Sequence, residues 1–257
     1  MKYSVIMPYY KRDSHLHNTL LSYRFYYKDR NDYEIIIVED VKNRLDEEEH
    51  DKLLKVINNY SDINIRLILS GFENCYNPSP MFNLGVKHSE GEFLIITNPE
   101  GFHKANILSG LDQLFNQDKS IYIVCASENV TDFPQYADSF ENFTYKFNMW
   151  YQHSKHRNAL FHFCSAISRE NYDKIGGFDE RFKDGIAYDD DDFRDTVLKA
   201  GIRTLVSDPL HTLHLAHKRD VENLPNFQEL VKRNELLYTL KKQNRSDEEI
   251  NKIMNII

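Results

Sequence analysis

Residues 91–100 read GEFLIITNPE, an apolar run that stops abruptly at a proline. A short run rich in isoleucine and bounded by glycine and proline is typical of a strand that is buried on both faces. Pro99 cannot continue a central strand, and Asn98 before it favours extended backbone. The stretch therefore predicts a core strand that delivers Glu100 to a turn at its carboxyl end. On this stretch alone, Glu100 is either a solvated turn residue or a metal ligand.

Similar segments lie on both sides of this one, so the pattern extends over the first half of the chain. Four more apolar runs predict strands, at residues 3–8, 33–40, 63–70 and 120–127. Helical patterns lie between the strands, at residues 14–28, 46–60, 81–89 and 105–117. Alternating strands and helices predict an α/β protein with a Rossmann-like, mostly parallel mixed sheet that is flanked by helices.

The second half of the chain is less regular. Residues 132–160 are aromatic and polar without a clear period, which predicts an irregular excursion over the edge of the sheet. A strand, a short helix and a Gly-Gly turn follow within residues 161–182, then a helix at 189–201 and a strand at 202–209. Beyond residue 219, one long helical stretch and a capped turn predict a helical C-terminal tail.

The composition excludes several classes of function. The chain of 257 residues carries a net charge of −8, which argues against a general nucleic-acid binder but leaves a nucleotide ligand open. No apolar run approaches the roughly 18 residues of a membrane span, and the short apolar stretch before Pro8 is not typical of a signal peptide. The three cysteines lack the spacing of a disulfide framework or a CxxC motif, so we expect a reducing, cytoplasmic location.

Acidic residues follow several of the predicted strands. Ligands of parallel sheets bind beyond the carboxyl ends of the strands, so these positions are the candidates for a site. The segments in question are residues 8–12, 39–40, 71–73 and 98–100. Three of the four carry acids, among them Asp40, Glu73 and Glu100. Acids at strand ends also serve solubility, so the pattern is consistent with a site without establishing one.

Four consecutive aspartates, Asp189 to Asp192, form the most conspicuous motif in the chain. Acids in the first turn of a helix cap free N–H groups and interact favourably with the helix dipole. Four in a row exceed what capping requires, and their mutual repulsion costs stability. Because side chains at a helix start point in different directions, one or two of these aspartates can face a cleft while the others cap.

Three histidines recur at a spacing of three residues, His211, His214 and His217. On a helical turn this spacing places neighbours on one face, whereas in an extended segment they alternate between faces. A single histidine is most often structural, but three at regular spacing favour metal binding. Two of them with Glu100 make a mixed oxygen and nitrogen site suited to a divalent cation such as Mn²⁺, and an aspartate beside it can act as general base.

The order of these features resembles a nucleotide-sugar glycosyltransferase of the GT-A fold. The segments SVIMPYYKR (4–12) and EIIIVED (34–40) are similar to the first two strands and loops of family 2 enzymes. The segment NLGVKHSEGEFLIITNPE (83–100) resembles the one that in relatives ends in an Asp-x-Asp metal triplet. In that alignment Asn98 and Glu100 stand at the two acidic positions.

The second half resembles the C-terminal region of β-1,4-galactosyltransferases. The similarity rests on GGFDERFKDGIAYDDDDF (176–193) and HLAHKRDVENLPN (214–226). The combined resemblance implies a GT-A domain over residues 1–218, followed by a helical extension over residues 219–257. The domain would divide into a nucleotide-binding half, 1–100, and an acceptor-binding half, 101–218.

The resemblance also implies roles for single residues. Asp190 would be the catalytic base, with Asp189 beside it orienting the acceptor. The ligands of the cation, Mn²⁺ or alternatively Mg²⁺, would be Glu100, His214 and His217. The residues around the nucleotide sugar would be Pro8, Tyr9, Tyr10, Arg12, Glu39, Asp40, Asn83 and Asn98. The residues near the acceptor would be Trp150, Tyr151, Phe178 and Asp179.

The implied reaction moves a sugar, with inversion, from a nucleotide sugar such as a UDP-sugar to a hydroxyl of a saccharide or glycan. Two other classes of protein remain as alternatives. A binding module of the same fold with a degraded metal triplet is favoured by Asn98. A nucleotidyltransferase would need a glycine-rich phosphate loop after the first strand, and MPYYKRDSH (7–15) contains no glycine.

Overall fold

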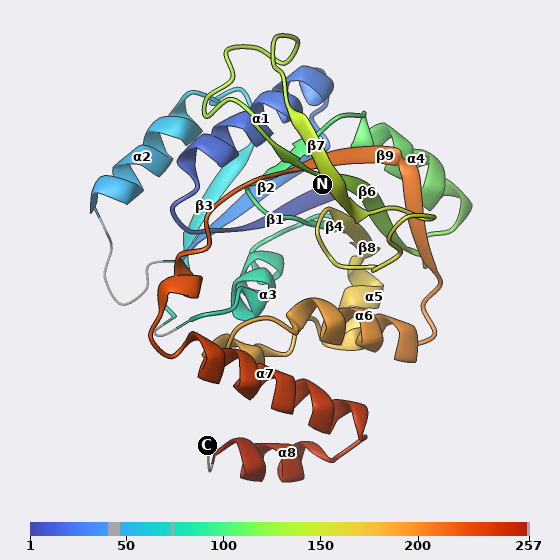
Figure 1. Ribbon diagram of the computed structural model, residues 1–257. Helices are drawn as coiled ribbons and strands as arrows, with labels where there is room; N and C mark the ends of the chain where they lie inside the picture. The colour runs from blue at the N-terminus through green and yellow to red at the C-terminus, as the bar shows by residue number, and fades with distance from the viewer. Residues whose placement is uncertain (41–46, 73–74, 256–257) are drawn as a thin grey trace.

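The computed structural model describes residues 1–40, 47–72 and 75–255 of the chain (Figure 1). Its strands are β1 (Tyr3–Tyr9), β2 (Tyr33–Glu39), β3 (Ile65–Leu69), β4 (Phe93–Ile96), β5 (Gly101–His103), β6 (Tyr122–Thr131), β7 (Lys146–Gln152), β8 (Ser165–Ser168) and β9 (Thr204–Leu215). Its α-helices are α1 (Asp13–Tyr27), α2 (Glu47–Asn58), α3 (Ser79–Lys87), α4 (Ile107–Gln117), α5 (Arg169–Ile175), α6 (Asp189–Lys199), α7 (Phe227–Lys242) and α8 (Asp247–Met254). Two short 3-10 helices are η1 (Glu180–Asp184) and η2 (Asp220–Asn223). The predicted alternation of strands and helices is confirmed, although the predicted helix start at residue 46 lies outside the described residues.

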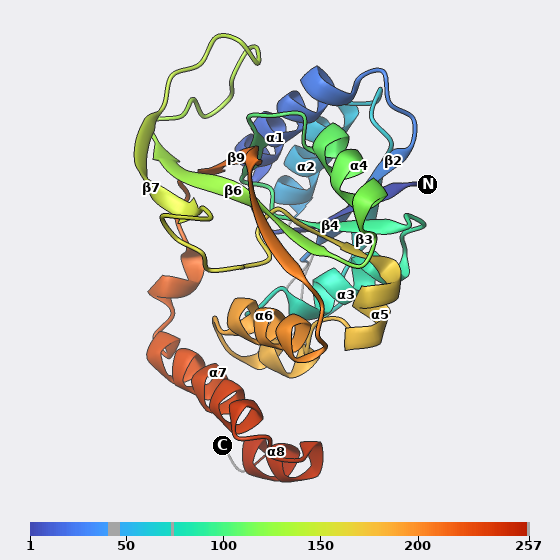
Figure 2. The same cartoon turned by 90° about the vertical axis from the view of Figure 1, so that its right-hand side faces the viewer.

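The strands form one mixed sheet in the order β3-β2-β1-β4-β8-β6-β9-β5, with β7 paired to β6. The strands β3, β2, β1 and β4 are mutually parallel. β8 runs antiparallel between β4 and β6, and β9 is again parallel to β6. β5 and β7 are antiparallel to their neighbours. The mostly parallel mixed sheet is therefore confirmed, and Figure 2 shows its β6–β7 part curling away from the first strands.

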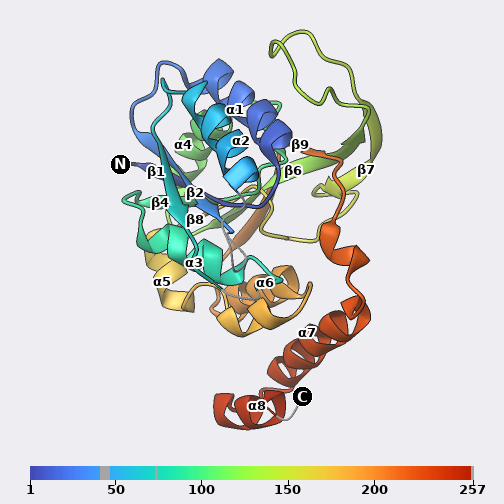
Figure 3. The ribbon, with the colours of Figure 1, turned by 90° about the vertical axis from the view of Figure 1, so that its left-hand side faces the viewer.

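Helices cover both faces of the sheet, which explains why the strands are apolar throughout. Ile35 and Ile37 of β2 belong to the core that α1, α2 and α4 cover. Ile36 and Val38 of the same strand belong to the core that α3, α5 and α6 cover. Successive side chains of a strand point to opposite faces, so a strand between two helical layers has no polar side. Figure 3 shows the two layers on either side of the sheet.

The last strand is longer than the sequence predicts. We expected it to end at Pro209, but β9 continues to Leu215 beside β6. The register shifts between the pairs Cys125↔Ser207 and Ala126↔His211, so the proline lies in a bulge. A residue without an N–H is tolerated at a bulge because it removes no ladder hydrogen bond there. The prediction that this proline ends the strand is therefore wrong.

The segment 132–160 is not wholly irregular, because Lys146–Gln152 form β7. Most of this strand is exposed, and only Gln152 at its end is buried. An exposed strand at the edge of a sheet lacks the apolar pattern by which a buried strand is recognised. The prediction of an irregular excursion is wrong for these residues.

The C-terminal tail is helical, as predicted. Leu237 of α7 and Ile250 of α8 pack on Phe182 of η1, and Figure 1 shows both helices below α6. The capped turn is confirmed by reciprocal hydrogen bonds between Ser246 and Glu249. Among the described residues, no helix combines the length and apolar character needed to cross a bilayer. The division into domain and extension stays a prediction.

Candidate active site

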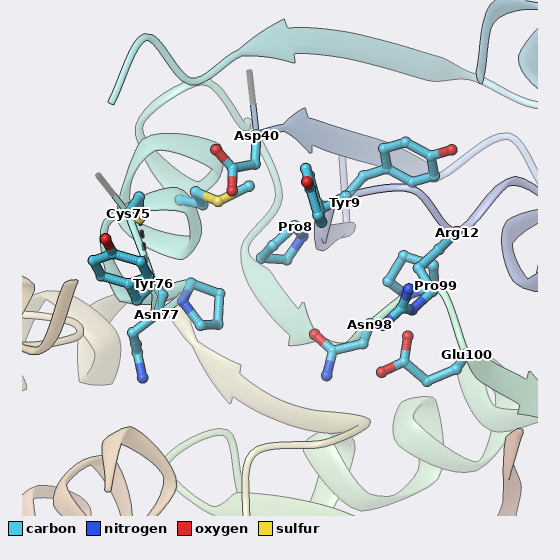
Figure 4. Close-up of a pocket in the computed structure, with 13 residues that line it drawn as sticks. Pro8, Tyr9, Arg12, Asp40, Cys75, Tyr76, Asn77, Asn98, Pro99 and Glu100 are labelled. Atoms are coloured by element: carbon cyan, nitrogen blue, oxygen red, sulfur yellow. Dashed lines mark hydrogen bonds between the residues drawn. The ribbon is translucent and has the colours of Figure 1, made fainter. Parts of the chain in front are cut away.

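The carboxyl ends of β1, β2 and β4 meet at one edge of the sheet, beside a pocket of about 210 Å³. This first pocket is lined by Pro8, Tyr9, Tyr10, Arg12, Asp40, Cys75, Tyr76, Asn77, Pro78, Met81, Asn98, Pro99 and Glu100. Figure 4 shows Asp40 at one end of the pocket and Asn98 and Glu100 next to each other at the other end. The pocket lies where a parallel sheet is expected to bind its ligand.

Asn98, Pro99 and Glu100 form a tight turn after β4. The N–H of Gly101 donates to the carbonyl oxygen of Asn98 over 3.1 Å. The hydroxyl of Thr19 in α1 donates to the carbonyl oxygen of Pro99 over 2.6 Å. Glu100 is only 7% exposed, so its interpretation as a solvated turn residue is wrong. The turn that follows β4 therefore places this carboxylate in a buried position.

Two histidines lie against the carboxylate of Glu100. Its Oε1 is 3.8 Å from Nε2 of His214 and 3.8 Å from Nε2 of His217. One ligand atom from each of the three side chains lies within 4.8 Å of the others. Within the described ranges, no other group of at least three histidine, cysteine or acidic residues meets that criterion. These separations leave room for a cation inside this Glu100–His214–His217 cluster.

Further hydrogen bonds orient both imidazoles. Nδ1 of His214 donates to Oδ1 of Asn129 over 2.6 Å, and Nδ1 of His217 donates to the carbonyl oxygen of Leu215 over 3.2 Å. A neutral ring that donates from Nδ1 keeps a lone pair on Nε2, which is the form that binds a metal. Asn129 was not predicted from the sequence.

The protonation states of the cluster also suit a cation. Burial raises the pKa of Glu100, but the two neighbouring histidines and Arg12 outweigh burial and lower that pKa to about 2. Burial lowers the pKa of His217 below its usual range. Near neutral pH the cluster therefore offers a carboxylate and a neutral imidazole.

His214 and His217 meet because the strand ends between them. His211 and His214 both lie in β9, and side chains three residues apart on a strand point to opposite faces. Nε2 of His211 instead lies 3.1 Å from Oε1 of Glu128. Beyond the end of β9, the chain leaves the sheet and His217 comes to lie on the side of His214. Of the two alternatives for this spacing, the extended one is therefore confirmed for His211 and His214.

A second pocket, of about 550 Å³, opens beside the first. Its lining includes the Glu100–His214–His217 cluster, the start of α6 and several aromatic and amide side chains. The residues common to both pockets are Tyr76, Asn77, Pro78, Asn98 and Glu100. Molecules bound in the two pockets would therefore meet next to Glu100.

Asp190 lines the second pocket and pairs with a buried histidine. Its Oδ1 lies 2.9 Å from Nδ1 of His162, which is 4% exposed. The contact is an ion pair when His162 is protonated. Burial lowers the pKa of His162, but Asp190 outweighs burial and raises that pKa. Burial raises the pKa of Asp190, but the charge of His162 outweighs burial and lowers that pKa. Burial and the charge of Asp190 raise the pKa of Asp189. Asp190 is thus the more readily ionised of the two.

The four aspartates of the acidic run have different surroundings. Asp189, Asp190 and Asp191 line the second pocket. Asp191 also forms an ion pair with Arg194 over 2.9 Å, and Asp192 forms one with Lys241 of α7 over 2.7 Å. The N-cap residue of α6 makes no side-chain hydrogen bond. Helix capping alone therefore does not account for the run.

Most of the residues predicted to hold a nucleotide sugar lie around the first pocket. Six of the eight line it: Pro8, Tyr9, Tyr10, Arg12, Asp40 and Asn98. Glu39 does not, and its Oε2 lies 2.7 Å from Nδ1 of His50 in α2. Asn83 is also elsewhere, with its amide bonded to the backbone of Phe178. The structure gives these two residues structural partners outside the pocket.

Of the four side chains expected near an acceptor, only Tyr151 lines the second pocket. Trp150 precedes it on β7, faces the other side of the sheet and packs against His211. Phe178 stacks between aromatic rings of α3 and α6 in the core. Asp179 forms an ion pair with α7. The structure therefore does not bring these last three residues to the pocket.

Three further polar residues at the site were not predicted from the sequence. His162 stands between two phenylalanines and reads as part of an apolar segment. Asn77 lines both pockets and donates from Nδ2 to Oδ1 of Asp189 over 2.7 Å. Arg219 lines the second pocket, and its place just after the histidines was the one available signal. Glu73, the remaining acid after a predicted strand, lies outside the described residues.

The fold is similar to those of known glycosyltransferases. The structure of S. aureus TarS 1–349 in complex with UDP-GlcNAc matches with a TM-score of 0.61 and 14% identity, over 85% of this chain and 60% of that one. The mannosyltransferase PcManGT from Pyrobaculum calidifontis, in complex with GDP-Man and Mn²⁺, matches with a TM-score of 0.60 and 15% identity, over 95% of this chain and 64% of that one. The expected GT-A fold is thereby confirmed.

The relation to these structures covers only part of their length. A structure of S. aureus TarS matches over 84% of this chain but 37% of its own, at 15% identity and a TM-score of 0.60. No curated protein matches the sequence significantly. The C-terminal similarity to β-1,4-galactosyltransferases stays a prediction.

A family profile gives the more specific result. The profile of the family described as glycosyl transferase family 2 matches residues 4–176. This segment is more than half of the chain and includes the carboxyl ends of β1, β2 and β4, which frame the first pocket. The chain therefore belongs to glycosyl transferase family 2.

Proposed function

We propose that the chain is an inverting, cation-dependent glycosyltransferase. It moves a sugar from a nucleotide sugar, in the first place a UDP-sugar, to a hydroxyl of a saccharide acceptor. The observation that carries this proposal is the meeting of two pockets at Glu100, with Asp190 in the second of them. Family membership supports the transfer chemistry. The TarS complex with UDP-GlcNAc and the PcManGT complex with GDP-Man and Mn²⁺ support the donor class and the cation.

The first pocket suits the nucleotide part of the donor. Asp40 lines the end remote from Glu100, where its carboxylate can accept hydrogen bonds from the base or the ribose. The diphosphate would then extend towards Glu100 and Arg12. The guanidinium of Arg12 is held in place because its Nη2 donates to the carbonyl oxygen of Lys218 over 2.6 Å. A fixed guanidinium stabilises diphosphate charge without first having to be ordered.

The second pocket suits an acceptor hydroxyl. Asp190 would take the proton of this hydroxyl while the hydroxyl oxygen attacks the anomeric carbon. The bond from that carbon to the diphosphate oxygen breaks as the new bond forms, and the attack from the opposite face inverts the configuration. Asp189, held by Asn77, would orient the acceptor. The ring of Tyr151 would pack against a sugar ring.

The Glu100–His214–His217 cluster would hold the divalent cation. When bound there, the cation supplies Lewis-acid stabilisation of the departing diphosphate. Carboxylate with imidazole suits Mn²⁺, whereas Mg²⁺ prefers oxygen ligands and water. Asn98 lies next to Glu100 and offers a neutral amide oxygen at a position where the resemblance to family 2 enzymes implies an acid.

Thermal unfolding with a panel of nucleotide sugars tests the proposal. We expect one nucleotide class to raise the unfolding midpoint, and to raise it more when Mn²⁺ is present, because a ligand of the native state stabilises it. Adding saccharide acceptors should then release the nucleoside diphosphate. If no UDP- or GDP-sugar binds with or without Mn²⁺, the proposal is wrong.

A non-catalytic binding module is the second candidate, and Asn98 in the metal triplet favours it. The discriminating measurement is the release of nucleoside diphosphate without an acceptor, since a working site transfers the sugar slowly to water. Cation-dependent release identifies an enzyme. Tight nucleotide-sugar binding without any release, with or without acceptors, identifies a binding module.

A further inference from the structure

The loop that precedes the catalytic aspartates has an unusual backbone. Ala187 and Tyr188 have φ angles of 64° and 68°. Residues other than glycine rarely adopt this left-handed conformation, and two in succession are rarer still. Ala187 is exposed and lines the second pocket, so packing of its own side chain does not hold it there. Neighbouring elements therefore impose the conformation.

The C-terminal helix α7 supplies the contacts that hold this loop. Nδ2 of Asn234 donates to the carbonyl oxygen of Ala187 over 3.1 Å and to that of Phe182 over 3.0 Å. The N–H of Ile186 donates to the carbonyl oxygen of Leu230 over 3.1 Å. Both anchors lie on α7, which Figures 1 and 2 show directly below α6.

Asn234 is fully buried, with 0% of its surface exposed. A buried amide destabilises a protein unless its hydrogen bonds are made, and this one donates one bond to the loop at Ala187 and one to Phe182 of η1 just before it. The loop also approaches the amide closely, because a Cβ on Gly185 would lie 2.3 Å from Oδ1 of Asn234. Loop and helix are thus fitted to each other, with no space for a side chain at Gly185.

We propose that Asn234 is a positioning residue for sugar transfer. It holds the loop of residues 185–188, in which Ala187 and Tyr188 are left-handed, at the start of α6, so that Asp189 and Asp190 face the second pocket. This inference rests on the proposed function. It makes the C-terminal helix part of the catalytic unit, although Asn234 is not among the residues that line either pocket.

The test compares Asn234→Leu, which keeps the side-chain size but removes the amide, with the unchanged protein. We expect kcat of transfer to fall at least about tenfold, because small displacements of a reacting group are costly. The Kd of the nucleotide sugar should stay within about twofold, since the first pocket is untouched. The matched control is Tyr238→Phe, one turn further along α7. It removes the 2.8 Å hydrogen bond to Asp195 but keeps the ring beside Tyr188, and kcat should not change.

Two further variants separate positioning from general stability. Ala187→Gly added to Asn234→Leu should restore part of kcat, because glycine adopts a positive φ without steric cost. A residue that only attached α7 to the protein would not be rescued in this way. Gly185→Ala adds a methyl group where the loop contacts Asn234. It should also lower kcat while nucleotide-sugar binding remains.

Three results would overturn the inference. The first is an unchanged kcat in Asn234→Leu, and the second is a loss of kcat in that variant that Ala187→Gly does not rescue. The third is loss of nucleotide-sugar binding in both Asn234→Leu and Gly185→Ala. The last result, including failure of both to fold, would make Asn234 a folding residue. If the unchanged protein itself neither binds nor turns over a nucleotide sugar, the proposed function fails instead.

Discussion

The two walls of the site are built in different ways. Much of the wall of the first pocket consists of short segments that follow parallel strands, such as Asp40 after β2 and Asn98 after β4. The wall of the second pocket depends on contacts between distant segments, such as the ion pair of Asp190 with His162 and the anchoring of Ala187 by α7. A strand register fixes the first wall, whereas several compensating interactions fix the second. We therefore expect substitutions in the second wall to lower the rate of turnover more than the affinity for the nucleotide sugar.

The largest effect should follow from Asp190→Asn. This change removes the proton acceptor but keeps the shape of the side chain, so transfer should fall by about 10²–10⁴-fold. The Kd of the nucleotide sugar should remain nearly unchanged, because the first wall is intact. Initial rates and calorimetric titration measure the two quantities separately. Asp195→Asn in the same helix is the control, and equal losses of binding and turnover in Asp190→Asn would refute the role of Asp190.

Removal of the two histidines tests the junction between the walls. In His214→Ala/His217→Ala, only one side chain of the cluster remains, so Mn²⁺ affinity and turnover should each fall by at least about tenfold. Chelation of the unchanged protein should have the same effect on turnover. The matched control is His211→Ala, on the opposite face of β9. It should keep the Mn²⁺ affinity and the turnover of the unchanged protein. Unaltered Mn²⁺ affinity in the double variant would contradict this assignment.

The pH dependence of kcat/KM in His162→Gln tests the buried pair of His162 and Asp190. The charge of His162 lowers the pKa of Asp190, so the base stays ionised to lower pH than burial alone would allow. Without that charge, burial raises the pKa of Asp190. The acidic limb of the kcat/KM profile should therefore move to higher pH. A limb at the same pH in both proteins would show that His162 does not act on the base.

The smallest effect concerns adjacent residues of β7. Tyr151 lines the second pocket and Trp150 does not. Loss of an aromatic contact of about 0.5–1.5 kcal/mol predicts an acceptor KM that is up to about tenfold higher in Tyr151→Ala. The acceptor KM of Trp150→Ala should be that of the unchanged protein. An acceptor KM that rises in Trp150→Ala but not in Tyr151→Ala would place the acceptor on the other face of the sheet.

The first wall was largely predictable from the sequence. Its strands are buried on both faces, so each appears as an apolar run, and Pro99 marks where one of them ends. The residues after such strands must share one edge of the sheet. For this reason Asp40, Asn98 and Glu100 could be grouped before any coordinates were known.

The second wall was predictable only in part. The clustering of acids and histidines in the sequence indicates Asp190, His214 and His217. His162 has no such signal, because its partner Asp190 lies 28 positions further along the chain. The bulge at Pro209 depends on pairing with β6, which local sequence does not reveal. The positive φ of Ala187 is imposed by Asn234 of α7 and contradicts local preference. Long-range contacts of this kind override the local pattern.

Diffraction from crystals grown with Mn²⁺ and a nucleoside diphosphate, recorded at the manganese absorption edge, would locate the cation. We expect an anomalous peak about 2 Å from a carboxylate oxygen of Glu100 and from Nε2 of His214 and His217. The diphosphate should contact the same ion from the first pocket. A nucleotide bound in the first pocket without a peak in this cluster, or with the peak at other residues, would contradict the proposed mechanism.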